Sequence, residues 1–163
     1  MGPVVELISF DAKYLKQLSN LIHGTIKSCY PVCYSPEVID FFLNYHCSKE
    51  LLRKTQLGNF VLAFIGKRLI GCGYLIKEEI GGIFVHPDYQ KRGYGKQILD
   101  YLLQQAKTKK LIQVWLDATP IAKDMYLKAG FEVVEKKTDI LDNNVPLEYF
   151  YMRKVLIPPA RGK

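Results

Sequence analysis

The chain has 163 residues, of which 48% are hydrophobic and 24% are charged, and its formal net charge is +7. This composition is typical of one folded domain and excludes a disordered or low-complexity protein. No apolar run approaches the roughly 18–20 residues that a membrane span needs. The first residues, Met1 to Leu7, lack the basic and apolar segments of a secretory signal, so we predict a cytoplasmic protein with no membrane partner.

The positive net charge predicts an anionic partner, and nucleic acid, an acidic membrane surface and a phosphorylated cofactor would all fit. The basic run Lys107-Thr108-Lys109-Lys110 has no interleaved aromatic residues, so it is not a nucleic-acid motif. We therefore expect no nucleic-acid partner.

The four cysteines are scattered and lack the spacing of a zinc site. We expect no metal, and thiols that are free and mostly buried, as is usual in a reducing compartment. The cysteines are Cys29, Cys33, Cys47 and Cys72.

The first third of the chain predicts one strand and then helices. Residues 4–9 are typical of a strand, and residues 11–23 carry leucine and isoleucine at helical spacing. Ser35-Pro36-Glu37 is a helix start, with an N-cap, a proline in the first turn and an acid near the positive end of the dipole. A further helical stretch begins at Ser48.

From residue 59 the hydrophobic period changes to that of strands, and two helices then interrupt the strands. Gly130 follows the second of these helices as its C′ residue. The resulting order, β-α-α-β-β-β-α-β-α-β-β, predicts a mixed sheet with helices on both faces. We expect a single domain over residues 4–156 and a flexible tail over 157–163. The predicted ranges are strands 59–65, 69–77 and 79–86, helix 93–106, strand 112–116, a helix from Thr119, and strands 131–135 and 147–154.

The segment from Ile83 to Lys96 is the most informative part of the chain. A strand ends at Pro87, a short loop follows, and a helix opens at Gly93 and Gly95. Backbone N–H groups in the first turn of a helix have no partner within it, and glycine lets a phosphate approach the backbone closely. This geometry suits a pyrophosphate, and a glycine-permissive turn would use the same residues. The third glycine of a dinucleotide fingerprint and the Gly-Lys-Ser/Thr of a P-loop are both missing.

Two blocks resemble a known family. Gln90-Lys91-Arg92-Gly93-Tyr94-Gly95 resembles the Gln/Arg-x-x-Gly-x-Gly/Ala signature of the GCN5-related N-acetyltransferase (GNAT) family. The block from Ala122 to Phe131 resembles that family's Ala-x-x-hydrophobic-Tyr-x-Lys-x-Gly-Phe. The resemblance rests on motifs over residues 59–135 and on topology elsewhere. It implies an α/β (α+β) fold with a mixed, mostly antiparallel sheet of about seven strands flanked by helices on both faces.

The resemblance also implies acetyl-coenzyme A as co-substrate. In this family the strands on either side of the signature helix splay apart, and the pantetheine arm lies between them. Thr119 stands where the family usually has asparagine, so we expect it to cap a helix, and its contact with the cofactor is left open. The residues implied to bind the cofactor are Phe84, Val85, Gln90, Lys91, Arg92, Gly93, Tyr94, Gly95 and Lys96.

Aminolysis of a thioester needs a neutral amine, an oxyanion donor and a proton for the leaving thiolate. By its separation from Gln90, Glu79 matches the family's general base, and it could equally be a solvated acid at a strand end. Tyr126 is implied to be the general acid, and the other interpretation is a core tyrosine. The backbone N–H of Phe84 or Val85 is the expected oxyanion donor. Gly81-Gly82 would allow a bulge or close ligand approach, and a plain bend fits these residues equally well.

The acceptor side is expected to come from the first helices, through Tyr30, Tyr34, Tyr45 and His46. His46 could be a second base, although a solvent-facing histidine at a helix end is the more usual arrangement.

We predict an enzyme, an acyltransferase that moves the acetyl group of acetyl-coenzyme A to a primary amine by direct attack in a ternary complex. The alternatives are a non-catalytic acyl-coenzyme A-binding module and a nucleic-acid binder. The sequence does not name the amine, which could be a small molecule or a peptide, and it allows a monomer or a homodimer.

Overall fold

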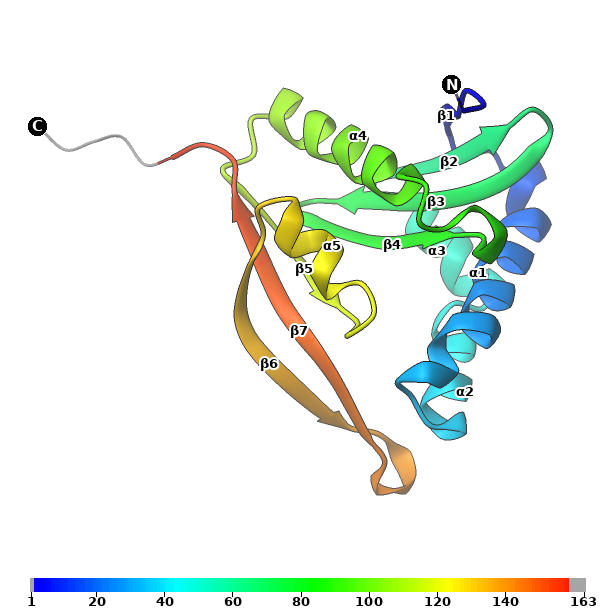
Figure 1. The fold of residues 1–163 in the computed structure, drawn as a ribbon, viewed down its shortest axis with the longest axis vertical. Helices are drawn as coiled ribbons and strands as arrows, with labels where there is room; N and C mark the ends of the chain where they lie inside the picture. Colours follow the sequence, from blue (N-terminus) through cyan, green and yellow to red (C-terminus); the bar gives the residue numbers. More distant parts are fainter. Residues whose placement is uncertain (1, 159–163) are drawn as a thin grey trace, which may run out of the picture.

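The computed structural model describes residues 2–158, which form a seven-stranded sheet in the order β1-β2-β3-β4-β5-β7-β6 (Figure 1). β4 and β5 run parallel, and every other neighbouring pair is antiparallel. The predicted mixed, mostly antiparallel sheet is thereby confirmed. The strands are β1 Glu6–Ser9, β2 Asn59–Ile65, β3 Arg68–Ile76, β4 Glu79–Val85, β5 Gln113–Ala118, β6 Glu132–Ile140 and β7 Pro146–Val155.

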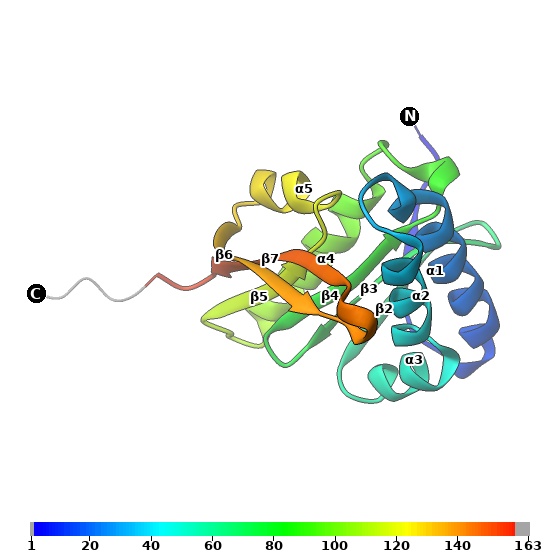
Figure 2. The same cartoon turned by 90° about the horizontal axis from the view of Figure 1, so that it is seen from below.

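Helices cover both faces of this sheet (Figure 2). α4 and α5 contribute to the hydrophobic core on one face, and α1 to α3 pack on the other. No helix within residues 2–158 combines the length and the hydrophobicity that crossing a membrane would require. The helices are α1 Leu15–Cys29, α2 Pro36–Tyr45, α3 Ser48–Thr55, α4 Tyr94–Thr108 and α5 Lys123–Lys128, with short 3-10 turns at Ala12–Tyr14, Tyr30–Val32, Pro87–Tyr89 and Asp142–Asn144.

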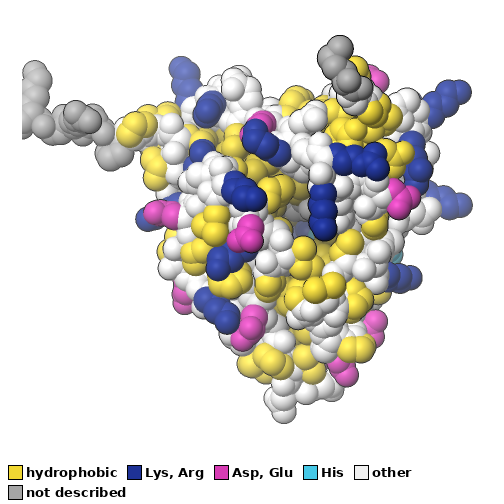
Figure 3. Space-filling view, viewed as in Figure 1, with side chains coloured by type: hydrophobic (Ala, Val, Ile, Leu, Met, Phe, Trp, Pro, Cys, Tyr) yellow, Lys and Arg dark blue, Asp and Glu magenta, His cyan; other side chains and the backbone are white. Residues whose placement is uncertain are grey.

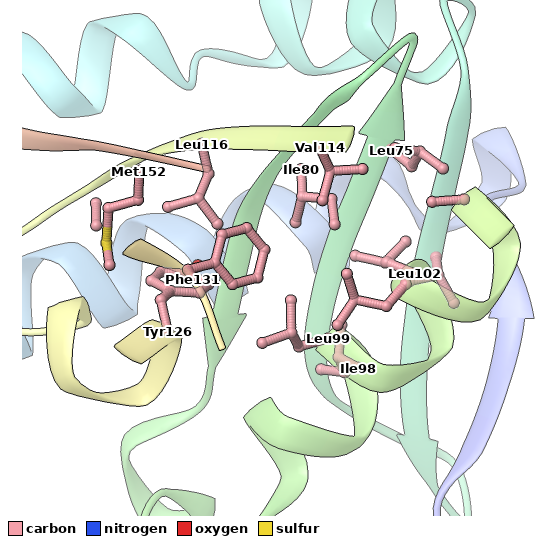
Figure 4. Packing of buried hydrophobic residues seen from close by; sticks show 14 of the residues in the cluster. Leu75, Ile80, Ile98, Leu99, Leu102, Val114, Leu116, Tyr126, Phe131 and Met152 are labelled. Atoms are coloured by element: carbon pink, nitrogen blue, oxygen red, sulfur yellow. The ribbon is translucent and has the colours of Figure 1, made fainter. Parts of the chain in front are cut away.

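The core under α4 shows why the helical period predicted this element correctly. Ile98, Leu99 and Leu102 lie on one face of α4 and are fully buried. They pack in the same cluster as Ile80 of β4 and Val114 of β5 (Figure 4). Burial of these apolar side chains stabilises the contact between the helix and the sheet. The positions of β4 and β5 relative to α4 are therefore set by a continuous apolar layer.

Several predicted boundaries differ from the structure. α1 begins at Leu15, after a 3-10 turn capped by Asp11, whose carboxylate accepts from Lys13 N (2.9 Å). It then continues through Gly24 to Cys29, because a glycine in a helix reduces stability without ending the helix. α2 starts as predicted, with Ser35 Oγ accepting from Val38 N (3.4 Å).

Near the C-terminus the differences have other causes. α5 begins at Lys123 instead of at Thr119, because the residues between them form a turn. β6 extends to Ile140, well beyond the predicted end at residue 135, because its polar second half pairs with β7 along a long hairpin. A flexible tail was expected at residues 157–163, and residues 159–163 of it lie outside the described residues.

The Gly81-Gly82 pair lies at an irregularity between β3 and β4. The register of the two strands shifts between Cys72 and Tyr74, and Gly82 has a φ of 59°. A Cβ on Gly81 would lie 2.5 Å from the Tyr74 hydroxyl, and one on Gly82 would lie 2.8 Å from the Tyr74 ring. Of the two interpretations left open, the structure shows a bulge, and the group that approaches these glycines closely is the Tyr74 side chain.

We predict that Gly82→Ala destabilises the protein. The left-handed backbone disfavours a Cβ by about 1–2 kcal/mol, before the contact with Tyr74 is counted. Because 1 kcal/mol shifts the Tm of a chain of this size by roughly 2–4 °C, we expect thermal unfolding to show a Tm lower by at least about 2 °C. Gly24→Ala is the control, because the added Cβ has nothing within 4 Å and Gly24 lies inside α1. An equal or higher Tm for Gly24→Ala is expected, and an unchanged Tm for Gly82→Ala would contradict the bulge assignment.

Candidate active site

β4 and β5 pair at a single position, where Glu79 lies opposite Trp115. Trp115 N also donates to Glu78 O (3.0 Å), immediately before β4. Beyond this point the two strands separate, and β5 pairs along its full length with β7 (Figure 1). The sheet therefore opens between β4 and β5, and the β4 edge that faces the opening has no neighbouring strand past Glu79.

A glycine-rich helix start lies at the far end of β4. Gly93 is the N-cap of α4 with a φ of 87°, and Lys91 also has a positive φ of 62°. Gln97 N donates to Gly93 O (3.0 Å), so the amides of the preceding turn have no partner within the helix. A Cβ on Gly95 would lie 3.2 Å from Met125 Sδ, so the start of α4 packs closely against α5. Free amides at the positive end of a helix dipole fit a pyrophosphate.

Basic side chains surround this helix start. Lys91 and Arg92 are exposed, and the Arg92 guanidinium lies over the Tyr89 ring, 5.7 Å from its centroid. Arg68 of β3 lies over the same ring at 5.2 Å. In the space-filling view, Lys and Arg side chains gather on the upper half of the molecule, around α4 and the loop before it (Figure 3). The loop therefore combines backbone donors with positive charge.

Three residues predicted to bind the cofactor have side chains engaged elsewhere. Gln90 Nε2 donates to Val85 O (2.8 Å), so this side chain ties the loop to the end of β4. The Tyr94 side chain is buried in the core. Lys96 Nζ forms an ion pair with Asp100 one turn along the helix (2.7 Å). Gln90 and Tyr94 can thus offer a phosphate only their backbone, and Lys96 would first have to leave its ion pair.

The backbone of Val85 faces the opening. His86 N donates to Ile70 O of β3 (2.8 Å), so His86 is directed toward β3. Since backbone groups alternate sides along a strand, Phe84 is also directed toward β3 and Val85 away from it. Val85 O accepts a hydrogen bond from Gln90 Nε2, which is consistent with this orientation. Of the two predicted oxyanion donors, the geometry favours Val85.

A cavity of about 230 Å³ lies between the α1–α2 segment and the opening. Aromatic residues of α1–α2 form one wall, and β4, β5 and the β6–β7 hairpin form the other. It thus places groups from both halves of the chain around one space. Its lining residues are Tyr30, Phe41, Phe42, Tyr45, His46, Tyr74, Glu79, Ile80, Gly81, Gly82, Ile83, Phe84, Asp117, Ala118, Thr119, Ala122, Tyr126, Asp139, Leu147 and Tyr149.

Glu79 lines this cavity, and its carboxylate is not the freely solvated group of the alternative interpretation. Tyr74 OH donates to Glu79 Oε1 (3.2 Å). Burial raises the pKa of Glu79, and Asp117 raises it further, whereas the Tyr74 hydrogen bond and the charge of Lys54 lower it. A half-buried carboxylate with a raised pKa is suited to accept a proton.

Lys54 also belongs to the surroundings of Glu79, and sequence reasoning missed it. Its side chain is buried, and among residues 2–158 its Nζ finds no hydrogen-bond partner. The ammonium lies 3.9 Å from the centroid of the Tyr45 ring and 5.6 Å from that of Tyr74. Burial lowers the pKa of Lys54, and Glu79 opposes that change. A signal was present, because Lys54 follows the buried Leu51 by three residues and so shares its helical face.

Tyr126 lines the same cavity from α5 and is 5% exposed. Its ring packs edge-on against Phe131 with centroids 5.7 Å apart, and both residues belong to the core under α4 (Figure 4). Burial raises the pKa of Tyr126 above that of a free phenol. The hydroxyl therefore keeps its proton at neutral pH, as a proton donor must.

The comparisons with known proteins decide the family. The pattern of the acetyltransferase (GNAT) family matches residues 19–131, more than half of the chain. The chain belongs to this family. None of the curated protein sequences compared with the acetyltransferase is significantly similar to it.

Solved structures share the fold of this acetyltransferase. A GCN5-related N-acetyltransferase from Rhodopseudomonas palustris superposes with a TM-score of 0.87 at 19% identity, over 96% of this chain and 99% of that one. PaiA N-acetyltransferase from Thermoplasma acidophilum, solved with coenzyme A, has a TM-score of 0.75 at 22% identity, over 93% and 99% of the two chains. An aminoglycoside 6′-N-acetyltransferase, also complexed with coenzyme A, has a TM-score of 0.68 at 17% identity, over 97% and 99%.

The four residues predicted on the acceptor side of the acetyltransferase are only partly brought together. Tyr30, Tyr45 and His46 line the cavity. Tyr34 is not part of its lining, and its hydroxyl instead donates to Glu148 O of β7 (2.9 Å). That bond joins the α1–α2 segment to the β6–β7 hairpin across the cavity.

The expectation of a solvent-facing His46 was wrong. His46 is 7% exposed, with its ring edge-on to Phe84 at 5.3 Å. Burial, and then the charges of Lys54 and His23, lower the pKa of His46 to about 3. It is therefore neutral at physiological pH. The α2 helix ends at Tyr45, and the following turn folds His46 inward onto the sheet.

Two further expectations concern Thr119 and the cysteines. Thr119 lines the cavity, and its Oγ1 accepts from Ala122 N (3.4 Å), so it caps a turn and not α5 itself. Only Cys72 is buried among the four free cysteines, so the expectation of mostly buried thiols was wrong. The other three lie at helix ends and in the turn after α1, where solvent reaches them. Within residues 2–158, no group of three or more His, Cys, Asp or Glu side chains could hold a metal ion.

Asp117, Asp139 and Tyr149 also line the cavity, and sequence reasoning missed all three. In the register of β5, β7 and β6, these residues point to the face opposite α4 and α5, as Glu79 does. Tyr149 OH donates to Asp139 Oδ2 (3.0 Å). The alternation of buried Val114 and Leu116 with exposed Asp117 was the available signal, but it could not show that this face borders a cavity.

Proposed function

We propose that this protein is an N-acetyltransferase that uses acetyl-coenzyme A as donor and a primary amine as acceptor, with direct transfer in a ternary complex. The observation that carries the proposal is the opening between β4 and β5. A helix start with free backbone amides follows β4, and a cavity lined by Glu79 and Tyr126 borders the strand. One elongated donor can therefore lie along the opening, and an amine in the cavity can reach its acetyl end.

On the donor side, the start of α4 would hold the pyrophosphate. The amides from Gly93 to Lys96 and the charges of Lys91 and Arg92 supply donors and positive potential. The unpaired edge of β4 offers backbone groups to an extended pantetheine arm, as an added strand would use them. Two neighbours with this fold were solved with coenzyme A, which supports the assignment.

On the acceptor side, an alkylammonium with a pKa near 10.4 must lose a proton before its nitrogen can attack. Glu79 accepts that proton, directly or through water, while a backbone N–H on the unpaired edge of β4 donates to the carbonyl oxygen on which charge grows. Bound acetyl-coenzyme A supplies the activated acetyl group. Tyr126 gives its proton to the departing sulfur as the carbon–sulfur bond breaks. The attacking nitrogen loses its second proton once it has bonded to carbon, and that proton passes through solvent to restore the Tyr126 hydroxyl. Glu79 releases the first proton to solvent.

The pyrophosphate assignment predicts a ligand-dependent Tm. Acetyl-coenzyme A at about 100 times its Kd stabilises a folded site by about 2.7 kcal/mol, which raises the Tm of this chain by roughly 5–10 °C. Gly93→Glu or Gly95→Glu abolishes this rise, because a carboxylate takes the place of the phosphate. Each variant is compared with its own ligand-free Tm. Gly66→Glu is the control, since Gly66 also has a positive φ but lies in the β2–β3 turn with open space around it. An undiminished rise in both α4 variants would remove the assignment.

The role of Glu79 predicts a pH-dependent loss in Glu79→Gln. Because the carboxylate is the active form and its pKa is raised, wild-type kcat/KM increases with pH as Glu79 loses its proton, and the variant lacks this limb. At pH 7 the variant is slower by about 10²–10⁴-fold, and it recovers partly at high pH, where the ammonium group loses its proton without help.

Two further variants sharpen this test. Glu78→Gln removes the neighbouring acid, which lies outside the cavity lining, and leaves the profile unchanged. Tyr74→Phe removes a hydrogen bond that lowers the Glu79 pKa, so its acid limb moves to higher pH. If the pH–rate profiles of Glu79→Gln and the wild type are the same, the base lies elsewhere.

Tyr126→Phe is expected to lower kcat about 100-fold or more and to leave acetyl-coenzyme A binding nearly unchanged. The hydroxyl matters when negative charge develops on sulfur and not in the ground state. The Tm rise reports binding, and single-turnover kinetics report chemistry. Tyr101→Phe is the matched control, a partly buried tyrosine packed on the same core through α4. Full kcat in Tyr126→Phe with chemistry rate-limiting would leave Tyr126 a core residue, and no transfer to any amine by the wild type would favour a binding module.

A further inference from the structure

The cavity differs sharply in charge from the rest of the protein. The chain carries 23 Lys and Arg residues against 16 Asp and Glu. Among the described residues, however, the charged side chains that line the cavity are Glu79, Asp117 and Asp139, and none is a Lys or Arg. An acidic cavity in a basic protein selects a cationic occupant.

The three carboxylates occupy different depths. Glu79 is half-buried beside Tyr74, whereas Asp117 and Asp139 are exposed at the side of the cavity formed by β5 and the β6–β7 hairpin. Asp117 is one strand over from Glu79 and two residues beyond its partner Trp115, past the point where the two strands separate. One carboxylate thus lies at the reacting end and two lie toward the mouth.

The neighbouring lysine side chains lie outside the cavity lining, so they do not neutralise its three carboxylates from within the cavity. Lys54 lies behind Tyr45 and Tyr74, and Lys137 lies over the Tyr151 ring at 4.9 Å, where it partly offsets Asp117. Neither side chain is part of the cavity lining. His46 does line the cavity, is 7% exposed, and has a buried Nδ1. As a neutral imidazole it adds no positive charge to the cavity.

Between the carboxylates, the walls are aromatic. Tyr30, Phe42 and Tyr45 border the cavity on one side and Tyr149 on the other. Aromatic faces contact methylene groups and attract ammonium ions. They offer no set of hydrogen-bond partners for the backbone of a peptide. The space therefore fits a short aliphatic chain with positive charge at both ends.

We propose that the acceptor is an aliphatic diamine or polyamine, whose reacting amine lies at Glu79 while a second ammonium group is held by Asp117 and Asp139. This inference rests on the proposed function and names its substrate class. The second ammonium keeps its proton throughout, so its binding energy is added to that of the reacting end in the Michaelis complex. A monoamine of equal length lacks that contact.

The test compares diaminobutane, with an amine at each end, with butylamine. A charge-assisted contact of this kind predicts a KM about 10–100-fold lower for diaminobutane. Asp117→Asn and Asp139→Asn, which keep the side-chain shape, should each reduce the ratio of the two kcat/KM values severalfold or more. Glu132→Gln is the control, a carboxylate on β6 that pairs with Arg153 outside the cavity, and the ratio should not change.

A binding experiment separates this inference from the proposed function. Diaminobutane is titrated calorimetrically into the protein saturated with coenzyme A, where no transfer can occur. Binding that weakens in both Asp variants supports the acidic subsite even if no amine is acetylated, in which case the proposed function alone fails. Equal kcat/KM for the two amines, or a higher value for triglycine than for diaminobutane, overturns the diamine assignment and leaves the acetyltransferase assignment standing.

Discussion

The single backbone pairing between β4 and β5 is the constraint on which the rest of the site depends. A parallel pair normally continues its ladder, but in the described part of the chain Glu79 and Trp115 form the only matched position before the strands separate. The continuous core under α4 and the full-length pairing of β5 with β7 keep the sheet intact around the opening. The opening thus leaves one edge of β4 unpaired, and it places Glu79 at the point where the strands part.

A second consequence is the environment of Glu79. The bulge at Gly81-Gly82 makes room for the Tyr74 ring, and the Tyr74 hydroxyl reaches the carboxylate as a result. The Lys54 ammonium lies 5.6 Å from the centroid of the same ring, and no group within residues 2–158 forms a hydrogen bond with it. Burial therefore raises the pKa of Glu79, while one hydrogen bond and one buried charge oppose the increase. A half-buried carboxylate with an adjusted pKa follows from packing that involves β3, β4 and α3 together.

The fold also separates charges by location. Exposed Lys and Arg side chains surround the start of α4, where an anionic donor would bind, whereas acids and aromatic rings line the cavity. The first region follows the end of β4, and the second borders the strand from Glu79 to Phe84. An anionic donor and a cationic acceptor would each be attracted to its own region, and only the reacting groups would need to meet. Net charge alone reports the first of these regions and conceals the second.

The sequence by itself determined the order of the elements, the family motifs and the glycine-rich helix start, because these depend on local periodicity and on residues adjacent in the chain. The length of β6, the inward turn of His46 and the meeting of Lys54, Asp117 and Asp139 around one cavity were decided only by the tertiary structure. Lys54 and Asp117 have local patterns of a buried helix position and an exposed strand position. What they contact depends on strand order, register and the opening of the sheet, which join residues far apart in the chain and leave no periodic signal along it.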